Sequence, residues 1–179
     1  NNYHIHKVMT NYLPNDEESK HYACLLQWDN IYYQPPTQEY LAPKTTVRVG
    51  LVQWQMRSYK TLDDLFEQVE FFVDAVSDYK SDFVLFPEYF NAPLMSKYND
   101  KGESQAIRGL AQYTEEIRDR FINLAVSYNI NIITGSMPLI KEDGLLYNAG
   151  FLCRRDGTYE MYEKLHVTPD EIKSWGLSG

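Results

Sequence analysis

The sequence predicts an α/β fold built around a mixed β-sheet, and three features carry this prediction. Over residues 47–139, apolar and β-branched runs of strand length alternate with segments whose apolar residues recur at helical spacing. Beyond residue 139 the pattern changes to strands joined by tight turns. Strand, helix, strand and helix followed by a run of adjacent strands is typical of a mixed sheet with helical cover.

The first two elements are a strand and an amphipathic helix. Val47–Trp54 is dominated by apolar and β-branched residues, which predicts a strand buried on both faces. Thr61 followed three residues later by Asp64 is a capping-box pattern that marks a helix start. The apolar positions of this helix are Leu62, Leu65, Phe66, Val69, Phe72, Val73 and Val76. Their spacing places one face of the helix in the core.

The second strand and second helix follow the same logic. Phe83–Phe86 is a short apolar run that predicts another buried strand, and a polar loop is expected over Asn91–Glu103. Thr114, with two glutamates behind it, is expected to cap a helix that ends at a left-handed Asn129. The apolar face of this helix comprises Ile117, Phe121, Leu124, Ala125 and Tyr128.

Three further strands complete the predicted sheet. They are Ile130–Leu139, Leu145–Arg154 and Tyr159–Leu165. The pairs Asp143-Gly144 and Asp156-Gly157 between them are strong hairpin signals, so these strands are expected to be antiparallel.

Two domains are predicted. Residues 1–44 are polar and rich in turn residues, with the paired prolines Pro35-Pro36, and are interpreted as an N-terminal arm or linker. Residues 45–179 hold the alternating elements and form the folded domain.

Composition excludes several classes of function. Seventeen basic and twenty-five acidic residues give a net charge of -8 with no basic stripe, so nucleic acid is not an expected partner. No apolar run approaches the roughly 20 residues that span a bilayer, and the first residues lack a secretory signal, so a cytoplasmic protein without membrane contact is expected. Cys24 and Cys153 form no metal or redox spacing and are interpreted as reduced thiols.

No cofactor or metal is expected. The chain lacks the glycine-rich patterns GxGxxG and GxxxxGK that bind phosphates. His166 has no second histidine or cysteine at a metal-ligand spacing, so a metal site is rejected.

Three residues are candidates for chemistry. Glu88 follows a buried strand, and a carboxylate walled by the adjacent Tyr89 and Phe90 would lose hydration and become a better base. Lys164, at the end of the last strand, is suited to stabilising an oxyanion, although a solvated surface cation is the commoner role. Glu171 lies near the same strand end and is alternatively a helix-start charge.

Cys153 is a candidate for a nucleophile that would act together with these residues. It lies within a strand, without a turn or helix start that would expose it and lower its pKa. A packed, unreactive thiol is therefore the favoured interpretation.

Taken together, these motifs resemble the nitrilase superfamily of carbon-nitrogen hydrolases over roughly Val47 to Gly179. The glutamate motif resembles residues 82–90 (DFVLFPEYF) and the lysine motif residues 162–171 (YEKLHVTPDE), while Asn148 fits the hairpin before the lysine. The resemblance implies a four-layer α-β-β-α sandwich, incomplete in this chain, that commonly forms dimers or larger homo-oligomers.

The resemblance also implies an activity. Glu88 would be the general base, Lys164 would stabilise the tetrahedral intermediate, and Glu171 would position the pair. The expected substrate is a small-molecule amide or nitrile, cleaved at a carbon-nitrogen bond other than a peptide bond.

The family's cysteine nucleophile is expected a few dozen residues beyond the lysine, and therefore outside these 179 residues. The chain by itself is expected to be inactive. Alternatives are a glutaminase domain or acyl transferase on the same scaffold, or a non-catalytic assembly or binding module.

Residues Met9 to Asn30 bear a separate resemblance to the end of a GNAT-type acetyltransferase domain. Some hydrolases of the nitrilase superfamily are fused behind such a domain, so residues 1–44 are also interpreted as the end of an upstream acetyltransferase-like domain.

Overall fold

The computed structural model describes residues 3–9, 23–28 and 46–179, and the chain divides into two compact units, Asn1–Thr45 and Thr46–Gly179. In the first unit, β1 (Tyr3–Met9) and β2 (Ala23–Trp28) pair as an antiparallel hairpin. The paired prolines at 35–36, and most of the segment that resembles an acetyltransferase, lie outside the described residues. The interpretation of residues 1–44 as an arm or linker, or as the end of an acetyltransferase-like domain, therefore stays a prediction.

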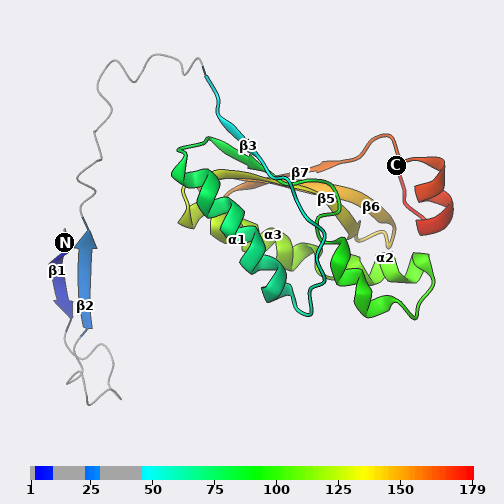
Figure 1. The fold of residues 1–179 in the computed structure, drawn as a ribbon, viewed down its shortest axis with the longest axis horizontal. Helices are drawn as coiled ribbons and strands as arrows, with labels where there is room; N and C mark the ends of the chain where they lie inside the picture. The colour runs from blue at the N-terminus through cyan, green and yellow to red at the C-terminus, as the bar shows by residue number, and fades with distance from the viewer. Residues whose placement is uncertain (1–2, 10–22, 29–45) are drawn as a thin grey trace. The chain divides into compact units, whose positions relative to one another are not determined.

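The second unit contains the predicted mixed sheet (Figure 1). Its five strands are β3 (Val49–Leu51), β4 (Phe83–Leu85), β5 (Asn131–Ile140), β6 (Leu146–Cys153) and β7 (Tyr159–Glu163), hydrogen-bonded in that order. The first three strands run parallel, whereas β6 and β7 are antiparallel to their neighbours. Parallel pairing requires the long crossovers that the helices provide, and tight turns suffice for the antiparallel pairs.

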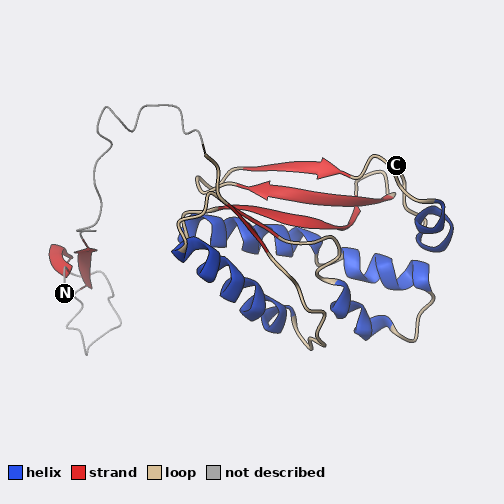
Figure 2. Ribbon diagram, turned by 45° about the horizontal axis from the view of Figure 1, so that its top comes forward, coloured by secondary structure: helices blue, strands red, loops and turns tan. Residues whose placement is uncertain are grey.

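The helical segments of this unit fill the crossovers and the end of the chain. They are α1 (Leu62–Asp78), η2 (Ala92–Tyr98), α2 (Glu103–Ala111), α3 (Thr114–Ser127) and the one-turn π-helix η3 (Glu171–Trp175). Helices α1 and α3 lie together on one face of the sheet (Figure 2). Among the described residues the opposite face has no such helical cover.

The start and the buried face of α1 agree with the sequence. The Thr61 hydroxyl accepts a bond from the Asp64 N–H, and the Asp64 carboxylate accepts one from the Thr61 N–H. Between α1, α3 and the sheet, Phe121 packs against Phe66, Phe86 and Phe90 with ring centroids 5.2–5.6 Å apart. The apolar spacing therefore identified the face that forms the core.

The predicted loop over Asn91–Glu103 is wrong, because most of it forms η2, and the helix α2 behind it was missed. Glycine lowers helix propensity, and Gly109 lies inside α2. The structure explains this glycine, since a Cβ there would come within 2.7 Å of the Tyr98 ring. Close packing of η2 against α2, which no local pattern reports, decides this element.

The start of α3 is also corrected. Thr114 does not cap the helix, because its hydroxyl donates to the main-chain oxygen of Pro138 at 2.5 Å and the N-cap is Tyr113. Asn129 does adopt the predicted left-handed conformation behind the helix, with φ of 50°. The Thr114 side chain thus ties α3 to β5 instead of closing its own first turn.

The prediction that the first strand is buried on both faces is wrong for the described residues. Val49 and Leu51 are 46% and 73% exposed, whereas Val84 on the neighbouring strand is fully buried beneath the helices. The difference arises because alternate side chains point to opposite faces of a sheet and only one face is covered here.

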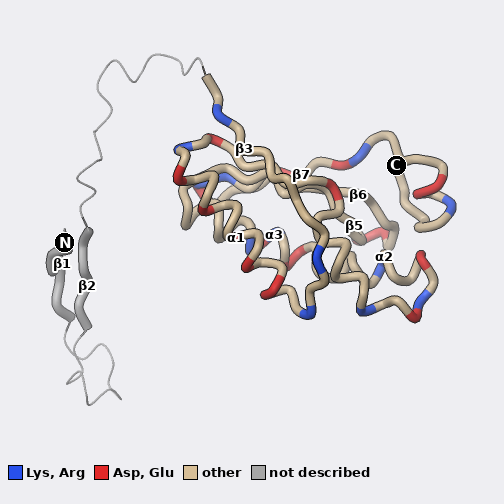
Figure 3. The backbone as a smooth tube through the Cα atoms, viewed as in Figure 1, with Lys and Arg blue, Asp and Glu red and all other residues tan. Residues whose placement is uncertain are grey.

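Acidic and basic positions are interspersed along the backbone of the second unit (Figure 3). Among the described residues, no helix combines the length and apolar character that crossing a membrane requires.

Candidate active site

Glu88 sits in a loop that two backbone hydrogen bonds hold against β5. The Phe86 N–H donates to the Ile133 oxygen at 2.9 Å, and the Tyr89 N–H donates to the Ser136 oxygen at 2.7 Å. Tyr89 has a φ of 53°, which is uncommon for a residue other than glycine. The backbone on both sides of Glu88 is therefore fixed, and the chain turns sharply directly after it.

A bulge in β5 makes room for this loop. Gly135 has a φ of 71°, and a Cβ at this position would lie 2.1 Å from the main-chain oxygen of Pro87. The pairing of β5 with β6 shifts register between Ile133 and Ser136, as expected where an extra residue is inserted in a strand. Only glycine fits both the backbone conformation and the close approach.

Lys164 directly follows β7 and reaches across the sheet to Glu88. Its Nζ lies 3.3 Å from Oε1 of Glu88 and 2.8 Å from Oε1 of Glu171. Its N–H donates to the main-chain oxygen of Asn148 at 2.8 Å, which continues the β6–β7 pairing. Glu163, the preceding residue, instead pairs with Lys141, as expected because successive side chains of a strand point to opposite faces. The fold thus joins an acid and an ammonium group that are 76 residues apart in the sequence.

Glu171 is the first residue of η3 and is nearly buried. Its Oε2 accepts bonds from the N–H and the hydroxyl of Thr168, at 2.8 and 2.9 Å. Burial opposes its charge, but the hydrogen bonds from Lys164 and Thr168 outweigh it and lower the pKa of Glu171. The bond to Glu171, supported by the charge of Glu88, raises the pKa of Lys164. Lys164 is therefore a cation at neutral pH.

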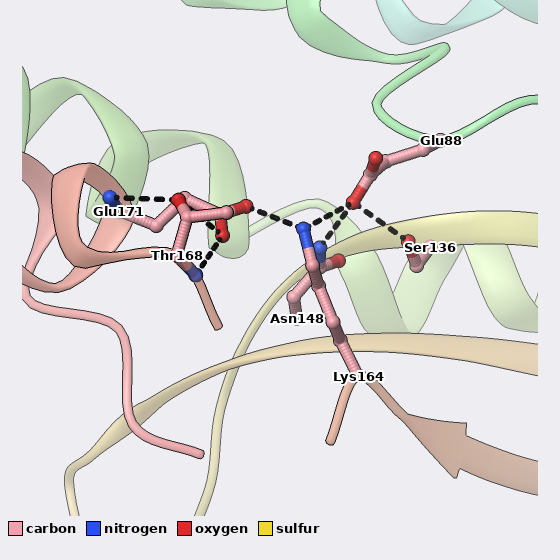
Figure 4. A network of polar contacts seen from close by, with 6 residues as sticks. All are labelled: Glu88, Ser136, Asn148, Lys164, Thr168 and Glu171. Carbon is pink, nitrogen blue, oxygen red and sulfur yellow. Dashed lines mark hydrogen bonds and ion pairs between the residues drawn. The ribbon is translucent and has the colours of Figure 1, made fainter. Parts of the chain in front are cut away.

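All three residues predicted for the site thus lie together, and besides Thr168 the structure adds two residues that contact Glu88 (Figure 4). The Nδ2 of Asn148 donates to Oε1 of Glu88 at 2.6 Å, and the Ser136 hydroxyl approaches the same oxygen at 3.5 Å. Asn148 was noted in the sequence only as part of the hairpin before the lysine. Its contact with Glu88 depends on the β5–β6 register, so no local pattern indicated it.

The expected aromatic wall around Glu88 is only partly present. Phe90 turns into the core and is fully buried, and the Glu88 side chain remains 48% exposed within the described chain. Tyr89 packs against Trp175 with ring centroids 5.4 Å apart. Burial, then the charges of Glu171 and Glu88, raise the pKa of Tyr89. The predicted loss of hydration at Glu88 is therefore wrong for these residues.

Cys153 is not part of this site. It is a free, fully buried thiol on the helix-covered face, where its Sγ lies 4.0 Å from the main-chain oxygen of Arg118. Burial, opposed by the Arg118 charge, raises the pKa of Cys153 to about 12. The interpretation of Cys153 as a thiol packed in the core is confirmed. His166 is exposed.

A groove of about 720 Å³ lies elsewhere on the molecule, between α3 and the hairpin strands. Its walls include Arg118, Phe151 and Met161. Neither Glu88 nor Lys164 lines it, so the candidate site depends on the polar cluster and not on this groove.

Comparison with known proteins shows the family to which this chain belongs. The carbon-nitrogen hydrolase family model matches residues 48–177, which is well over half of the chain. The chain therefore belongs to the carbon-nitrogen hydrolase family, within the nitrilase superfamily that its motifs resemble.

A curated relative supports this assignment. The chain is 41% identical over 179 residues to the probable hydrolase YhcX of Bacillus subtilis (strain 168). The match covers 99% of this chain and 35% of that protein, so the chain spans about a third of the length of this relative.

Solved structures at lower identity share the fold. A carbon-nitrogen hydrolase from Helicobacter pylori G27 superposes with a TM-score of 0.59 at 18% identity, over 74% of this chain and 45% of that one. An amidase from Nesterenkonia sp. gives a TM-score of 0.58 at 19% identity, over 74% and 48%. The predicted nitrilase-like α/β fold is confirmed.

Proposed function

We propose that this chain is part of an enzyme that hydrolyses a non-peptide carbon-nitrogen bond of a small amide or nitrile. The observation that carries the proposal is the contact of Lys164 with both Glu88 and Glu171, at 3.3 and 2.8 Å. The Glu88 carboxylate is accessible and can therefore exchange a proton with a reacting group. The Lys164 cation beside it is held by Glu171 and can stabilise a negative charge that develops in the reaction.

Each residue takes a distinct role in the proposed reaction. Glu88 removes the proton of a cysteine thiol, and the thiolate attacks the carbonyl or nitrile carbon. Lys164 donates to the atom that becomes negative on this attack, which is the oxygen of the tetrahedral intermediate from an amide or the nitrogen of the thioimidate from a nitrile. The hydrogen bond to Glu171 raises the pKa of Lys164 and so keeps Lys164 positively charged. With an amide, Glu88 then returns the proton to the leaving nitrogen, and after ammonia or an amine departs it activates the water that hydrolyses the thioester. With a nitrile, the first adduct is a thioimidate, and Glu88 activates an additional water that adds to it before ammonia leaves and the same thioester forms.

The nucleophile is proposed to lie outside residues 1–179. Cys153 is buried on the helix-covered face with a raised pKa, and the side chain of Cys24 lies outside the described residues. The curated relative is about three times as long as this chain, which leaves room for a cysteine-bearing segment.

The relatives favour an amide substrate. One mutant of the Nesterenkonia amidase was solved in complex with butyramide. Another carries the acetamide moiety of fluoroacetamide covalently added at the active site cysteine. We extend this chemistry to the present chain as a proposal for short aliphatic amides.

Replacing Glu88 tests the proposal in the complete protein. Glu88→Gln keeps the shape of the side chain but removes its basicity, so ammonia release from short amides should fall by about 100- to 10,000-fold. Mass spectrometry should show no acyl-enzyme. Glu163→Gln is the matched control, because Glu163 pairs with Lys141 away from the site.

Undiminished turnover in Glu88→Gln would end the proposal. Adding an amine to the same assay separates hydrolysis from acyl transfer, since a transferase forms the new amide in preference to the free acid.

A further inference from the structure

We propose that Asn148 positions Glu88, by holding Oε1 so that Oε2 is the oxygen that takes up and returns the proton. This inference rests on the proposed function, because it assigns a role within that reaction. It concerns a residue whose side chain carries no charge and cannot itself exchange protons at neutral pH.

The two carboxylate oxygens of Glu88 have unequal surroundings. Oε1 is approached by Asn148 Nδ2 at 2.6 Å, Lys164 Nζ at 3.3 Å and Ser136 Oγ at 3.5 Å. Among the residues that the structure describes, Oε2 accepts no hydrogen bond, and Figure 4 shows it directed away from the three donors. An oxygen surrounded by three donors has little remaining capacity to accept a proton, so Oε2 is the free basic position.

Asn148 makes the shortest of these contacts and has the least freedom to move. Its side chain is almost completely buried, with the residue 1% exposed. Lys164 is long and is also bound by Glu171 at 2.8 Å, and the Ser136 contact is at the limit of a hydrogen bond. The amide of Asn148 is therefore the donor best suited to fixing the half-exposed Glu88 side chain in one orientation.

Asn148 also fixes the second member of the pair. Its main-chain oxygen accepts the Lys164 N–H at 2.8 Å, while its side chain binds Glu88. It is the third residue of β6 and is paired with Pro138 on β5, so the sheet itself holds it in place. One residue thus sets the positions of both the base and the cation relative to the sheet.

The loss of this contact should affect the chemical step more than substrate binding. Without Asn148, the Glu88 side chain can adopt other rotamers, and a hydrogen bond to its charged form is lost. A hydrogen bond to a charged group contributes about 10- to 100-fold in an equilibrium or rate. We therefore expect kcat in Asn148→Ala and Asn148→Asp to fall by about 10- to 100-fold, with KM changed by less than about threefold.

The pH dependence distinguishes positioning from a purely structural role. In Asn148→Asp the introduced carboxyl keeps the shape of the amide. When protonated it can donate to Oε1, and when ionised it repels the Glu88 carboxylate. The activity of this variant relative to the wild type should therefore rise as the pH falls. Damage to the fold alone would lower activity by the same factor at every pH at which both proteins stay folded.

Asn131 provides matched control substitutions. Its Nδ2 donates to the main-chain oxygen of Asp82 at 2.9 Å, near the start of β5 and away from Glu88. Asn131→Ala and Asn131→Asp, made in the complete protein, should keep kcat within about twofold, and thermal melts should show all four variants folded. If Asn148→Ala does not fold, the shape-preserving Asn148→Asp alone carries the test.

The outcomes separate this inference from the proposed function. Unchanged kcat in a folded Asn148→Asp variant, or a loss that is independent of pH, overturns the inference. If Glu88→Gln abolishes turnover in the same assay, the proposed function survives that result. If Glu88→Gln is fully active, the proposed function fails and this inference fails with it.

Discussion

The two faces of the sheet formed by β3 to β7 differ in how far their side chains are buried and in which residues they carry. On the helix-covered face, Val84, Ile132 and Phe151 are at most 1% exposed and belong to the core. The opposite face of the same sheet carries Leu51 at 73% exposure and Tyr162 at 42%, together with Asn148 of the candidate site. One face thus supplies stability, while the other holds the polar cluster and leaves apolar side chains in contact with water.

The apolar side chains of the second face form a continuous row. Leu51, Leu85, Ile133 and Leu152 lie in register across four neighbouring strands, and all are at least partly exposed. Exposed apolar patches on a folded unit mark surfaces that another element or chain covers. We propose that the second sheet implied by the nitrilase-like sandwich covers this row in the complete protein.

The largest expected effect lies on the helix-covered face. Phe121 is fully buried among Phe66, Phe86 and Phe90, so Phe121→Ala should lower the free energy of unfolding by about 3–5 kcal/mol. Urea unfolding of residues 1–179 measures this change. Phe71→Ala is the control, because Phe71 is 66% exposed on α1 and should cost less than about 0.5 kcal/mol. Similar losses in the two variants would contradict the assignment of the core.

An intermediate effect is expected at the polar cluster. Glu171→Gln removes a nearly buried charge that binds Lys164 and Thr168, and should cost about 1–3 kcal/mol near neutral pH. Glu163→Gln is the control at the more accessible pair with Lys141, where about 1 kcal/mol or less is expected.

The effect of Glu171→Gln should depend on pH in a defined way. The pKa of Glu171 is lowered by folding, so its contribution is full above the ordinary value of 4.5 and is lost as the pH falls through the folded value. The pKa of Lys164 is raised, so its contribution is full below 10.5 and is lost as the pH rises through the folded value. Urea unfolding across this range should show the largest difference from wild type between these limits. A difference that does not decline as the pH is lowered below 4.5 would contradict the pairing.

The smallest expected effect lies on the uncovered face. Leu51→Ala should change the stability of residues 1–179 by less than about 0.5 kcal/mol, because this side chain is 73% exposed. In the complete protein the same substitution should cost about 2–5 kcal/mol if a second sheet covers it. Equal values from urea unfolding of the two proteins would contradict the proposed cover.

Local patterns predicted much of the fold, and their failures have physical causes. The capping box at Thr61 and the apolar spacing of α1 depend on residues within a few positions, and both are confirmed. Helix α2 was missed because Gly109 weakens its local signal while its packing against Tyr98 lies outside any window of sequence. Thr114 was misassigned as a cap because its partner, Pro138, is on another element.

The candidate site shows the same division. Glu88, Lys164 and Glu171 were located from the strand ends and from motifs that resemble a known family, and the structure brings them together. The contact of Asn148 with Glu88 and the bulge at Gly135 were not found in this way. Both depend on how β5 and β6 are aligned, which is a property of the assembled sheet.

The sequence by itself determined the five strands of the sheet, the helices α1 and α3, and the residues that stand at the strand ends where chemistry is placed. It did so because periodicity, caps and turns act over a few neighbouring residues. Only the tertiary structure decided that the ammonium group of Lys164 meets a carboxylate 76 residues away, and that the sheet is covered on one face alone within the described chain. Those outcomes depend on strand register and on packing between distant elements, which no short stretch of sequence contains.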